Sequence, residues 1–162
     1  MSINCWQDLE REVDKLLINR VRKHPFYYHR FYDTKSASNF LPKQPADFFC
    51  INRGRVHFIE CKFSEKHESL KSCFAGAVKD HQLASAFLVK RAMASYWILF
   101  YSSKTQRFEL WDGGYCREQG KVGKPLNLAE RQVFDSLENA VLGGMMNGYR
   151  KDLLRSASRS ES

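Results

Sequence analysis

The chain has few of the features that mark membrane-spanning, secreted and zinc-binding proteins. Its apolar runs are far shorter than the roughly 18 residues that cross a membrane. The opening segment MSINCWQDLERE has neither the basic nor the apolar part of a secretory signal. The five cysteines are an odd number, and none stands in a CxxC or CxxH spacing. These absences predict a cytoplasmic protein with reduced thiols and without a membrane partner.

Other absences exclude nucleotide-binding and repeat proteins. The sequence has no glycine-rich phosphate loop, no internal repeat, and no metal spacing among its five histidines. A hydrophobic content of 43% and an aromatic content of 14% exclude a disordered chain. At 162 residues we expect one domain over residues 1–154, followed by a disordered tail, RSASRSES, at 155–162.

What the chain has instead is positive charge. The net charge is +8 and the isoelectric point is about 9.3, which attracts nucleic acid first and anionic membranes second. Between residues 20 and 32, the cations Arg20, Arg22, Lys23 and Arg30 alternate with a dense set of aromatic rings. Cations contact phosphates and rings stack on bases, so this segment is a candidate DNA contact. A buried strand, FYYHRFY, is the other interpretation, and the two are compatible.

The order of hydrophobic patterns predicts a single α/β domain with a mixed central sheet flanked by helices. The expected elements are a helix over 5–22, a strand over 26–32, a hairpin of strands 46–51 and 56–63, a helix over 79–92, strands over 96–101 and 108–111, and a helix over 128–142. Asn4 with Gln7 would cap the first helix, and Gly143-Gly144 would end the last. We expect loops over 33–45, 64–77 and 113–124.

The predicted hairpin, PADFFCINRGRVHFIECK, brings acidic side chains together. With Arg53-Gly54 at the tip, Asp47 lies opposite Glu60, and opposed Cβ atoms are about 5 Å apart. Because side chains alternate with period two, Lys62 shares their face. Two carboxylates this close repel each other unless a cation lies between them. A divalent metal and a lysine would meet this need, as in a metal-dependent phosphodiesterase site.

A third acid follows from the phase of the first helix. At about 100° per residue, the apolar stripe of this helix is centred near Trp6 and Val13. Glu10 lies closer to that centre than Glu12 or Asp14 does, so Glu10 is expected to face inward. The alternative is that Glu10 lies at the exposed margin of the stripe.

Together these motifs resemble the PD-(D/E)XK nuclease superfamily and, within it, the Holliday junction resolvases of the archaeal and RecU types. The likeness spans roughly residues 6–112 and implies a restriction-endonuclease-like fold. The matching segments are Leu9-Glu10, Lys35-Ser36-Ala37-Ser38, Pro45-Ala46-Asp47, Ile59-Glu60-Cys61-Lys62 and His81-Gln82-Leu83. The chain departs from the family in one residue inserted between the proline and the aspartate, and in a serine loop without the usual proline and glycine.

The resemblance implies a metal-dependent endodeoxyribonuclease of prokaryotic, archaeal or phage origin that cuts four-way DNA junctions as a homodimer, in recombination and repair. Mg²⁺, or Mn²⁺ in its place, would be held by Asp47, Glu60 and the Cys61 carbonyl, with Glu10 at a second ion or a bound water. Lys62 and Gln82 would act on the attacking water. The resemblance adds Lys35, Ser36 and Ser38 to the expected DNA contacts.

Two other functions remain open from the residues. One is a nuclease of the same superfamily with a restriction, repair or phage DNA-processing substrate. The other is a non-catalytic nucleic-acid-binding protein, against which the set of Asp47, Glu60 and Lys62 argues. The small size leaves little room for a sequence-reading domain, which favours recognition of DNA shape.

Overall fold

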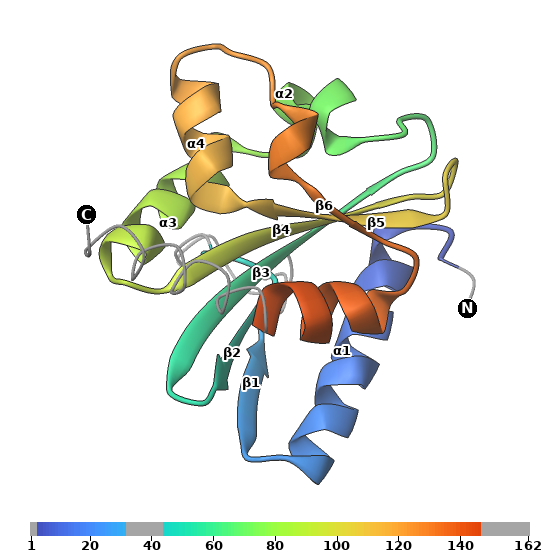
Figure 1. Ribbon diagram of the computed structural model, residues 1–162, viewed down its shortest axis with the longest axis vertical. Coiled ribbons are helices and arrows are strands. Elements are labelled where there is room, and N and C mark those ends of the chain that lie inside the picture. Colours follow the sequence, from blue (N-terminus) through green and yellow to red (C-terminus); the bar gives the residue numbers. More distant parts are fainter. Residues whose placement is uncertain (1–2, 32–43, 147–162) are drawn as a thin grey trace, which may run out of the picture.

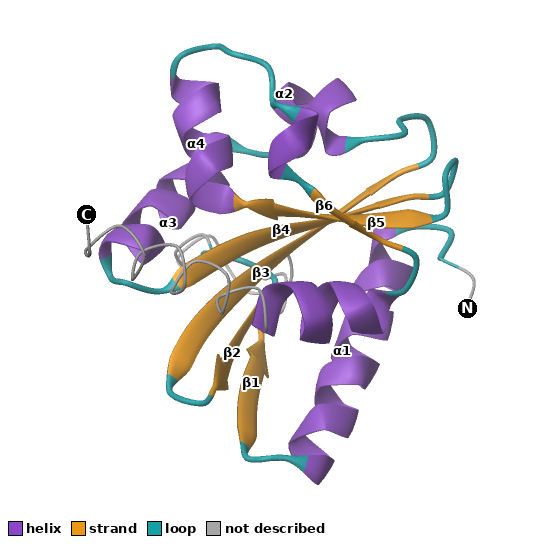
Figure 2. Ribbon diagram, in the orientation of Figure 1, coloured by secondary structure: helices purple, strands orange, loops and turns teal. Residues whose placement is uncertain are grey.

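The computed structural model describes residues 3–31 and 44–146, and its centre is a six-stranded sheet between two layers of helices (Figure 1, Figure 2). The strands are β1 (Phe26–Arg30), β2 (Phe48–Asn52), β3 (Arg55–Ser64), β4 (Ser95–Ser102), β5 (Arg107–Asp112) and β6 (Gln132–Phe134). They lie side by side in chain order. All neighbours are antiparallel apart from β3 and β4, which are parallel. The predicted single-domain α/β fold with a mixed sheet is confirmed.

Helices cover both faces of the sheet (Figure 1). The helical elements are α1 (Trp6–Lys23), the 3₁₀-helix η1 (Leu70–Ser72), α2 (Phe74–Ala77), α3 (Asp80–Arg91), α4 (Gly113–Lys121), the 3₁₀-helix η2 (Leu128–Glu130) and the π-helix η3 (Asn139–Met145). One face packs against α1 and η3, and the other against α3 and α4. In the described part of the chain, no helix is long and apolar enough to span a bilayer.

The apolar stripe of α1 forms the core of its layer. Leu9, Val13 and Leu17 recur every four residues, and all three are fully buried. They pack in one cluster with Ile59 and Leu99, whose side chains point to the same face of the sheet. This packing fixes which residues of β3 face α1 and therefore which residues face α3.

A buried carboxylate, Glu109 of β5, ties the sheet to the segments on the α3 side. Its Oε2 accepts hydrogen bonds from the Ser69 hydroxyl, the Leu70 amide and the Trp111 indole at 2.9–3.0 Å. Its Oε1 pairs with Arg131. Such full satisfaction is what allows a carboxylate to remain 2% exposed. The contacts fix η1 within residues 64–77, where the sequence predicted only a loop.

Two glycine-containing segments differ from the sequence-based prediction. Residues 113–124, predicted as a loop, include helix α4, whose first turn is capped by the Asp112 side chain at the Tyr115 amide. The predicted helix over 128–142 is wrong, because residues 132–134 form the edge strand β6. Gly143-Gly144 lies inside η3 rather than after a helix. The N-cap residue of α1 is Cys5 rather than the predicted Asn4, and its side chain makes no capping hydrogen bond; the Asp8 carboxylate accepts from the Asn4 amide.

The packing of η3 on β6 can be tested with two adjacent glycines. A Cβ at Gly144 would collide with the Phe134 ring and lie 3.1 Å from Leu110 Cδ2, whereas nothing lies within 4 Å of a Cβ at Gly143. Gly144→Ala should therefore lower the free energy of unfolding by about 1–3 kcal/mol. Gly143→Ala should leave it unchanged or raise it by up to about 1 kcal/mol, because alanine loses less backbone entropy than glycine in a helix. Urea denaturation measures both, and equal effects would contradict this packing.

Candidate functional site

The hairpin of β2 and β3 has the register that the sequence predicted. Phe48 pairs with Ile59 and Ile51 pairs with Val56. At the tip, Arg53 and Gly54 have φ values of 51° and 76°, which is the left-handed backbone of a two-residue hairpin turn. Asp47 lies one residue before β2, and its amide donates to the Ile59 carbonyl at 3.1 Å. The hydrogen-bonded pairing of β2 with β3 therefore ends next to Asp47 and Glu60.

Glu60 is held by side chains from three elements. Its Oε1 accepts from Lys62 Nζ at 2.7 Å and from the Gln82 amide, which projects from the first turn of α3. Gln82 is fixed in turn, because its Oε1 accepts from the Lys79 amide at 2.9 Å. The Tyr96 hydroxyl of β4 lies 3.4 Å from Glu60 Oε2 and donates to the Pro45 carbonyl at 2.8 Å. The Glu60 side chain is 3% exposed.

Asp47 faces the same strand through its side chain. Its Oδ2 accepts from the Cys61 amide at 2.6 Å, so its carboxylate is anchored to β3 between Glu60 and Lys62. The Cys61 thiol points to the opposite face, where it lies in the cluster that contains α1. The structure therefore brings Asp47, Glu60, Lys62 and Gln82 together at one edge of the core.

The electrostatics of the site leave a demand for positive charge. Burial, followed by the negative charge of Asp47, raises the pKa of Glu60 from 4.5 to about 7 despite the attraction of Lys62. Burial also raises the pKa of the Cys61 thiol, and the charges of Asp47, Glu10 and Glu60 raise it further. One lysine thus offsets only part of the repulsion between the acids.

Glu10 reaches this region from the other face of the sheet. It is a half-buried residue of α1, and its Oε2 pairs with Arg30 Nη2 of β1 at 2.9 Å. Arg30 Nη1 lies 3.4 Å from Asp14, whose other oxygen accepts from the Tyr28 hydroxyl at 3.0 Å. Asp14 therefore shares the side of α1 that faces Arg30, contrary to the predicted helical phase. Glu12 points elsewhere and pairs with Lys15.

The predicted DNA-contacting residues separate into groups. Arg22 and Lys23 are exposed at the C-terminal end of α1, while Arg20 is half-buried. Arg30 is directed at the two acids of α1 rather than at solvent, and its guanidinium also lies over the Phe48 ring. Lys35, Ser36 and Ser38 lie outside the described residues, as does the predicted tail over 155–162.

Tyr96 is the member of this cluster that sequence reasoning missed. It belongs to YWILFY, an apolar strand in which a tyrosine has no distinguishing pattern. Its position next to Glu60 depends on the parallel pairing of β3 with β4, where Phe58 lies beside Tyr96. Sequence periodicity gives strand faces but not the register between strands that are far apart in the chain.

The donor set suits a hard divalent cation. Among residues 3–31 and 44–146, no three His, Cys, Asp or Glu side chains gather as a metal-binding group. Asp47 and Glu60 are two carboxylates, and Mg²⁺ is commonly bound by one or two carboxylates together with waters. The raised pKa of Glu60 indicates that a cation beside the pair would relieve their repulsion. The residues present therefore fit such an ion.

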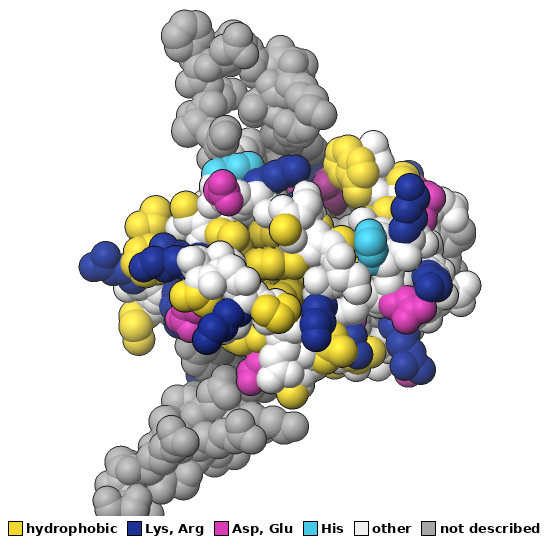
Figure 3. Space-filling model, turned by 90° about the horizontal axis from the view of Figure 1, so that it is seen from above, with side chains coloured by type: hydrophobic (Ala, Val, Ile, Leu, Met, Phe, Trp, Pro, Cys, Tyr) yellow, Lys and Arg dark blue, Asp and Glu magenta, His cyan; other side chains and the backbone are white. Residues whose placement is uncertain are grey.

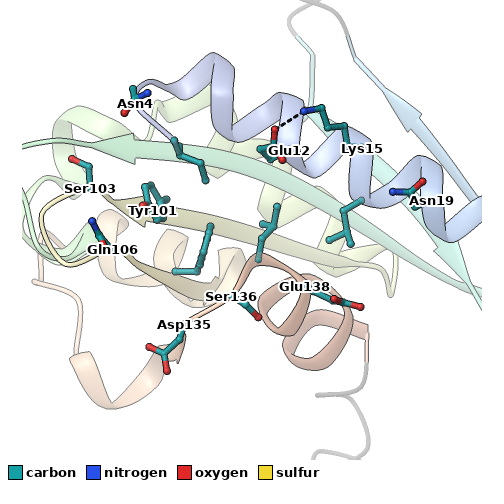
Figure 4. A pocket seen from close by; sticks show the side chains of 14 residues that line it. Asn4, Glu12, Lys15, Asn19, Tyr101, Ser103, Gln106, Asp135, Ser136 and Glu138 are labelled. Atoms are coloured by element: carbon teal, nitrogen blue, oxygen red, sulfur yellow. Dashed lines mark hydrogen bonds and ion pairs between the residues drawn. The ribbon is translucent and has the colours of Figure 1, made fainter. Parts of the chain in front are cut away.

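Two cavities in the described residues lie away from Asp47 and Glu60. One, of about 820 Å³, lies between α1 and residues 135–138, where Glu12, Asp135 and Glu138 outnumber Lys15 (Figure 4). Its acidic lining is unsuited to a polyanion. The other, of about 420 Å³, is lined by Phe74, Leu83 and Leu126 among others. Seen from above, hydrophobic side chains gather near the centre of the molecule with Lys and Arg spread around them (Figure 3).

The raised pKa of Glu60 predicts that the free energy of unfolding depends on pH. Between about pH 4.5 and pH 7 the folded protein keeps a proton on Glu60 that the unfolded chain releases. Stability should therefore fall as the pH rises through this range, by up to ~1.4 kcal/mol per pH unit. Glu60→Gln does not titrate, so the stability of this variant relative to the unmutated protein should increase from pH 5 to pH 8.

Urea denaturation in EDTA at several pH values measures this difference. Glu118→Gln is a matched control, because Glu118 is 65% exposed and pairs only loosely with Lys90 at 3.3 Å. Its effect should be nearly constant with pH. A constant difference for Glu60→Gln would contradict the raised pKa.

Comparison with known proteins gives a structural likeness and no sequence match. The chain matches no protein-family model and no curated protein. Among solved structures it is similar to a Holliday junction resolvase from the archaeal hyperthermophile Archaeoglobus fulgidus, with 13% sequence identity and a TM-score of 0.40. The likeness covers 67% of this chain and 74% of that protein.

Proposed function

We propose that this protein is a metal-dependent DNA endonuclease that hydrolyses phosphodiester bonds at four-way junctions. The observation that carries the proposal is the cluster of Asp47, Glu60 and Lys62, in which two carboxylates and one lysine meet at a buried strand edge. The order of the motifs along the chain, which resembles the PD-(D/E)XK nucleases, supports the same reaction.

In this proposal, Asp47, Glu60 and the main-chain carbonyl of Cys61 would hold Mg²⁺, with Mn²⁺ as a substitute. The ion would supply Lewis-acid polarisation of the phosphate and acidify a bound water. Gln82 and Tyr96 restrain the Glu60 carboxylate, so that its oxygens keep one orientation. Lys62, whose Nζ is 2.7 Å from Glu60, supplies positive charge for the phosphorane-like transition state or orients the water.

Glu10 has a more distant role in the proposal. Its charge raises the pKa of Cys61, so it acts at the back of the same strand, and Arg30 holds its carboxylate. In the proposal, Glu10 would contact a second ion or a metal-bound water. Arg30 is therefore proposed to position Glu10 and Asp14, and phosphate contact is assigned to the exposed Arg22 and Lys23.

Junction DNA is the finer part of the proposal. The net charge of +8 favours a polyanion as the ligand. Two strands of a junction must be cut symmetrically, which a two-fold homodimer would achieve with two equivalent sites. A non-catalytic DNA-binding protein would have no need for a buried glutamate beside a half-buried aspartate, an arrangement that costs folding energy.

One cleavage assay tests the reaction and its substrate together. With Mg²⁺, the protein should make paired symmetric cuts in a four-way junction and cut a flap or linear duplex of the same length much more slowly. Asp47→Asn and Glu60→Gln should each reduce the cleavage rate by at least about a hundredfold. DNA affinity in EDTA should stay the same or increase, because removal of an acid lessens repulsion of phosphate.

The outcomes separate the two levels of the proposal. Full cleavage by either variant would overturn the site. Equal cutting of linear duplex and junction, or a monomer at working concentration, would overturn junction resolution and leave a nuclease of other specificity. Binding without cleavage by the unmutated protein would favour the non-catalytic alternative.

The two neighbouring acids of α1 give a matched pair of variants. Glu10→Gln should lower the cleavage rate by at least about tenfold, because it removes the charge that faces β3 and releases Arg30. Glu12→Gln should change the rate less than about twofold, since Glu12 pairs with Lys15 at the wall of the 820 Å³ cavity. Single-turnover rates at saturating enzyme measure both. Similar losses in the two variants would show that Glu10 has no particular role.

A further inference from the structure

An aromatic surface lies on the side of the sheet that carries Glu60. We call it the aromatic face, and it consists of Tyr27, His29, Phe31, Phe49 and Phe58. On this side, α3 and α4 pack mainly against β4 and β5 and leave β1 and β2 much less covered. Tyr27 is 54% exposed, and His29 is exposed as well. The outer part of the aromatic face is therefore open to a ligand.

The rings form a row that ends at the candidate site. His29, Phe49, Phe58 and Tyr96 occupy directly paired positions on four adjacent strands. Successive ring centroids are 5.8, 5.9 and 6.5 Å apart, and the last two rings are nearly parallel. At the inner end, the Tyr96 hydroxyl lies 3.4 Å from Glu60 Oε2. The row thus leads from the edge strand to the acid pair.

Exposed cations lie at one end of the aromatic face. The pairing of Phe26 with Asn52, and of Asn52 with Arg55, places the hairpin tip beside the start of β1. Arg53 in the turn is exposed, as are the residues that precede β1, Arg22 and Lys23 among them. Arg55 is exposed as well, but the alternation along β3 directs its side chain to the face opposite Phe58. At the other end, the Phe31 amide donates to the Asp47 carbonyl at 2.8 Å. A polyanion could therefore be held at the cations while it passes over the rings.

We propose that the aromatic face is a stacking platform for unpaired bases of the DNA strand that enters the candidate site. This inference rests on the proposed function for the identity of the polymer. Aromatic rings stack on every base, whereas the bases of a continuous duplex are already stacked on one another. A branch point supplies unpaired bases, and the exposed Arg22, Lys23 and Arg53 complement its phosphates. A second copy of this chain fits less well, because it would bring the same cations to the contact.

Binding measured in EDTA tests the platform without any cleavage. The double variant Tyr27→Leu with His29→Leu keeps apolar side chains but removes two exposed rings, whereas Tyr27→Phe with His29→Phe keeps the rings. Fluorescence anisotropy should show at least about a fivefold loss of affinity for a 12-nucleotide thymidine strand in the leucine variant. The phenylalanine variant should stay within about twofold of the unmutated protein. Affinity for linear duplex should change less than about twofold in both.

Trp6→Leu is the control for loss of an exposed ring elsewhere, because Trp6 is 45% exposed on α1. It should leave single-strand affinity unchanged. A second measurement needs no variant: a 2-aminopurine in the thymidine strand should be quenched when the unmutated protein binds, as stacking requires.

Several results would overturn the platform. They are equal single-strand affinity in the leucine and unmutated proteins, an equal loss in Trp6→Leu, or absence of 2-aminopurine quenching. A dimer that dissociates in the leucine variant, with single-strand affinity intact, would assign the face to self-association instead. Because every measurement is made without metal, failure of the nuclease proposal in the cleavage assay would leave these outcomes unaffected.

Discussion

The repulsion between the carboxylates of Asp47 and Glu60, which meet where β2 begins beside β3, determines which side chains surround them. Asp47 and Glu60 are brought together by the register of one hairpin, and the burial of Glu60 beside the charge of Asp47 makes its ionised form costly. The surrounding groups each reduce that cost: the Cys61 amide at Asp47, and Lys62 with Gln82 at Glu60. Such a pair adds little to stability, which supports the catalytic role proposed for it.

The segment from Phe26 to Phe31 shows how one strand serves two purposes. Tyr28 and Arg30 point to α1, where they bind Asp14 and Glu10, and Phe26 is buried in the same layer. Tyr27 and His29 point to the opposite face, toward Phe49. Because side chains alternate along a strand, the residues that face α1 stabilise the packing, while Tyr27 and His29 on the other face stay exposed. The interpretation as a partly buried strand is therefore confirmed, and the exposed residues leave the proposed ligand contact possible in space.

Local patterns made the hairpin predictable, while distant contacts decided the segments that were predicted wrongly. Arg53-Gly54 between alternating apolar residues is a strong turn signal, and the pairing from Phe48–Ile59 to Ile51–Val56 follows from it. By contrast, Val133 and Phe134 fit a helical stripe in the sequence. In the structure they pair with β5 instead and form strand β6 at the edge of the sheet.

Glycines misled in a similar way. Gly113 was predicted to be part of a loop, yet it is the first residue of α4. It is a glycine because a Cβ there would collide with Tyr96 and crowd Ala86. Glycine that serves close packing and glycine that serves a turn look the same in one sequence. At the candidate site, the hairpin register placed Asp47, Glu60 and Lys62 together, and the family resemblance added Gln82; the structure brings these four side chains together. Tyr96 and the Arg30–Asp14 contact required the fold, since neither follows from spacing along the chain.

The parallel pairing of β3 with β4 has a consequence for how the protein folds. The chain must complete the crossover of residues 65–94 before these strands can join. The β2–β3 hairpin forms from neighbours in sequence, so it can pair early, while Glu60 is still hydrated and its charge costs little. Gln82 and Tyr96 arrive only with the crossover and β4. The energetic penalty of burying Glu60 beside Asp47 therefore falls on closure of the crossover rather than on formation of the hairpin.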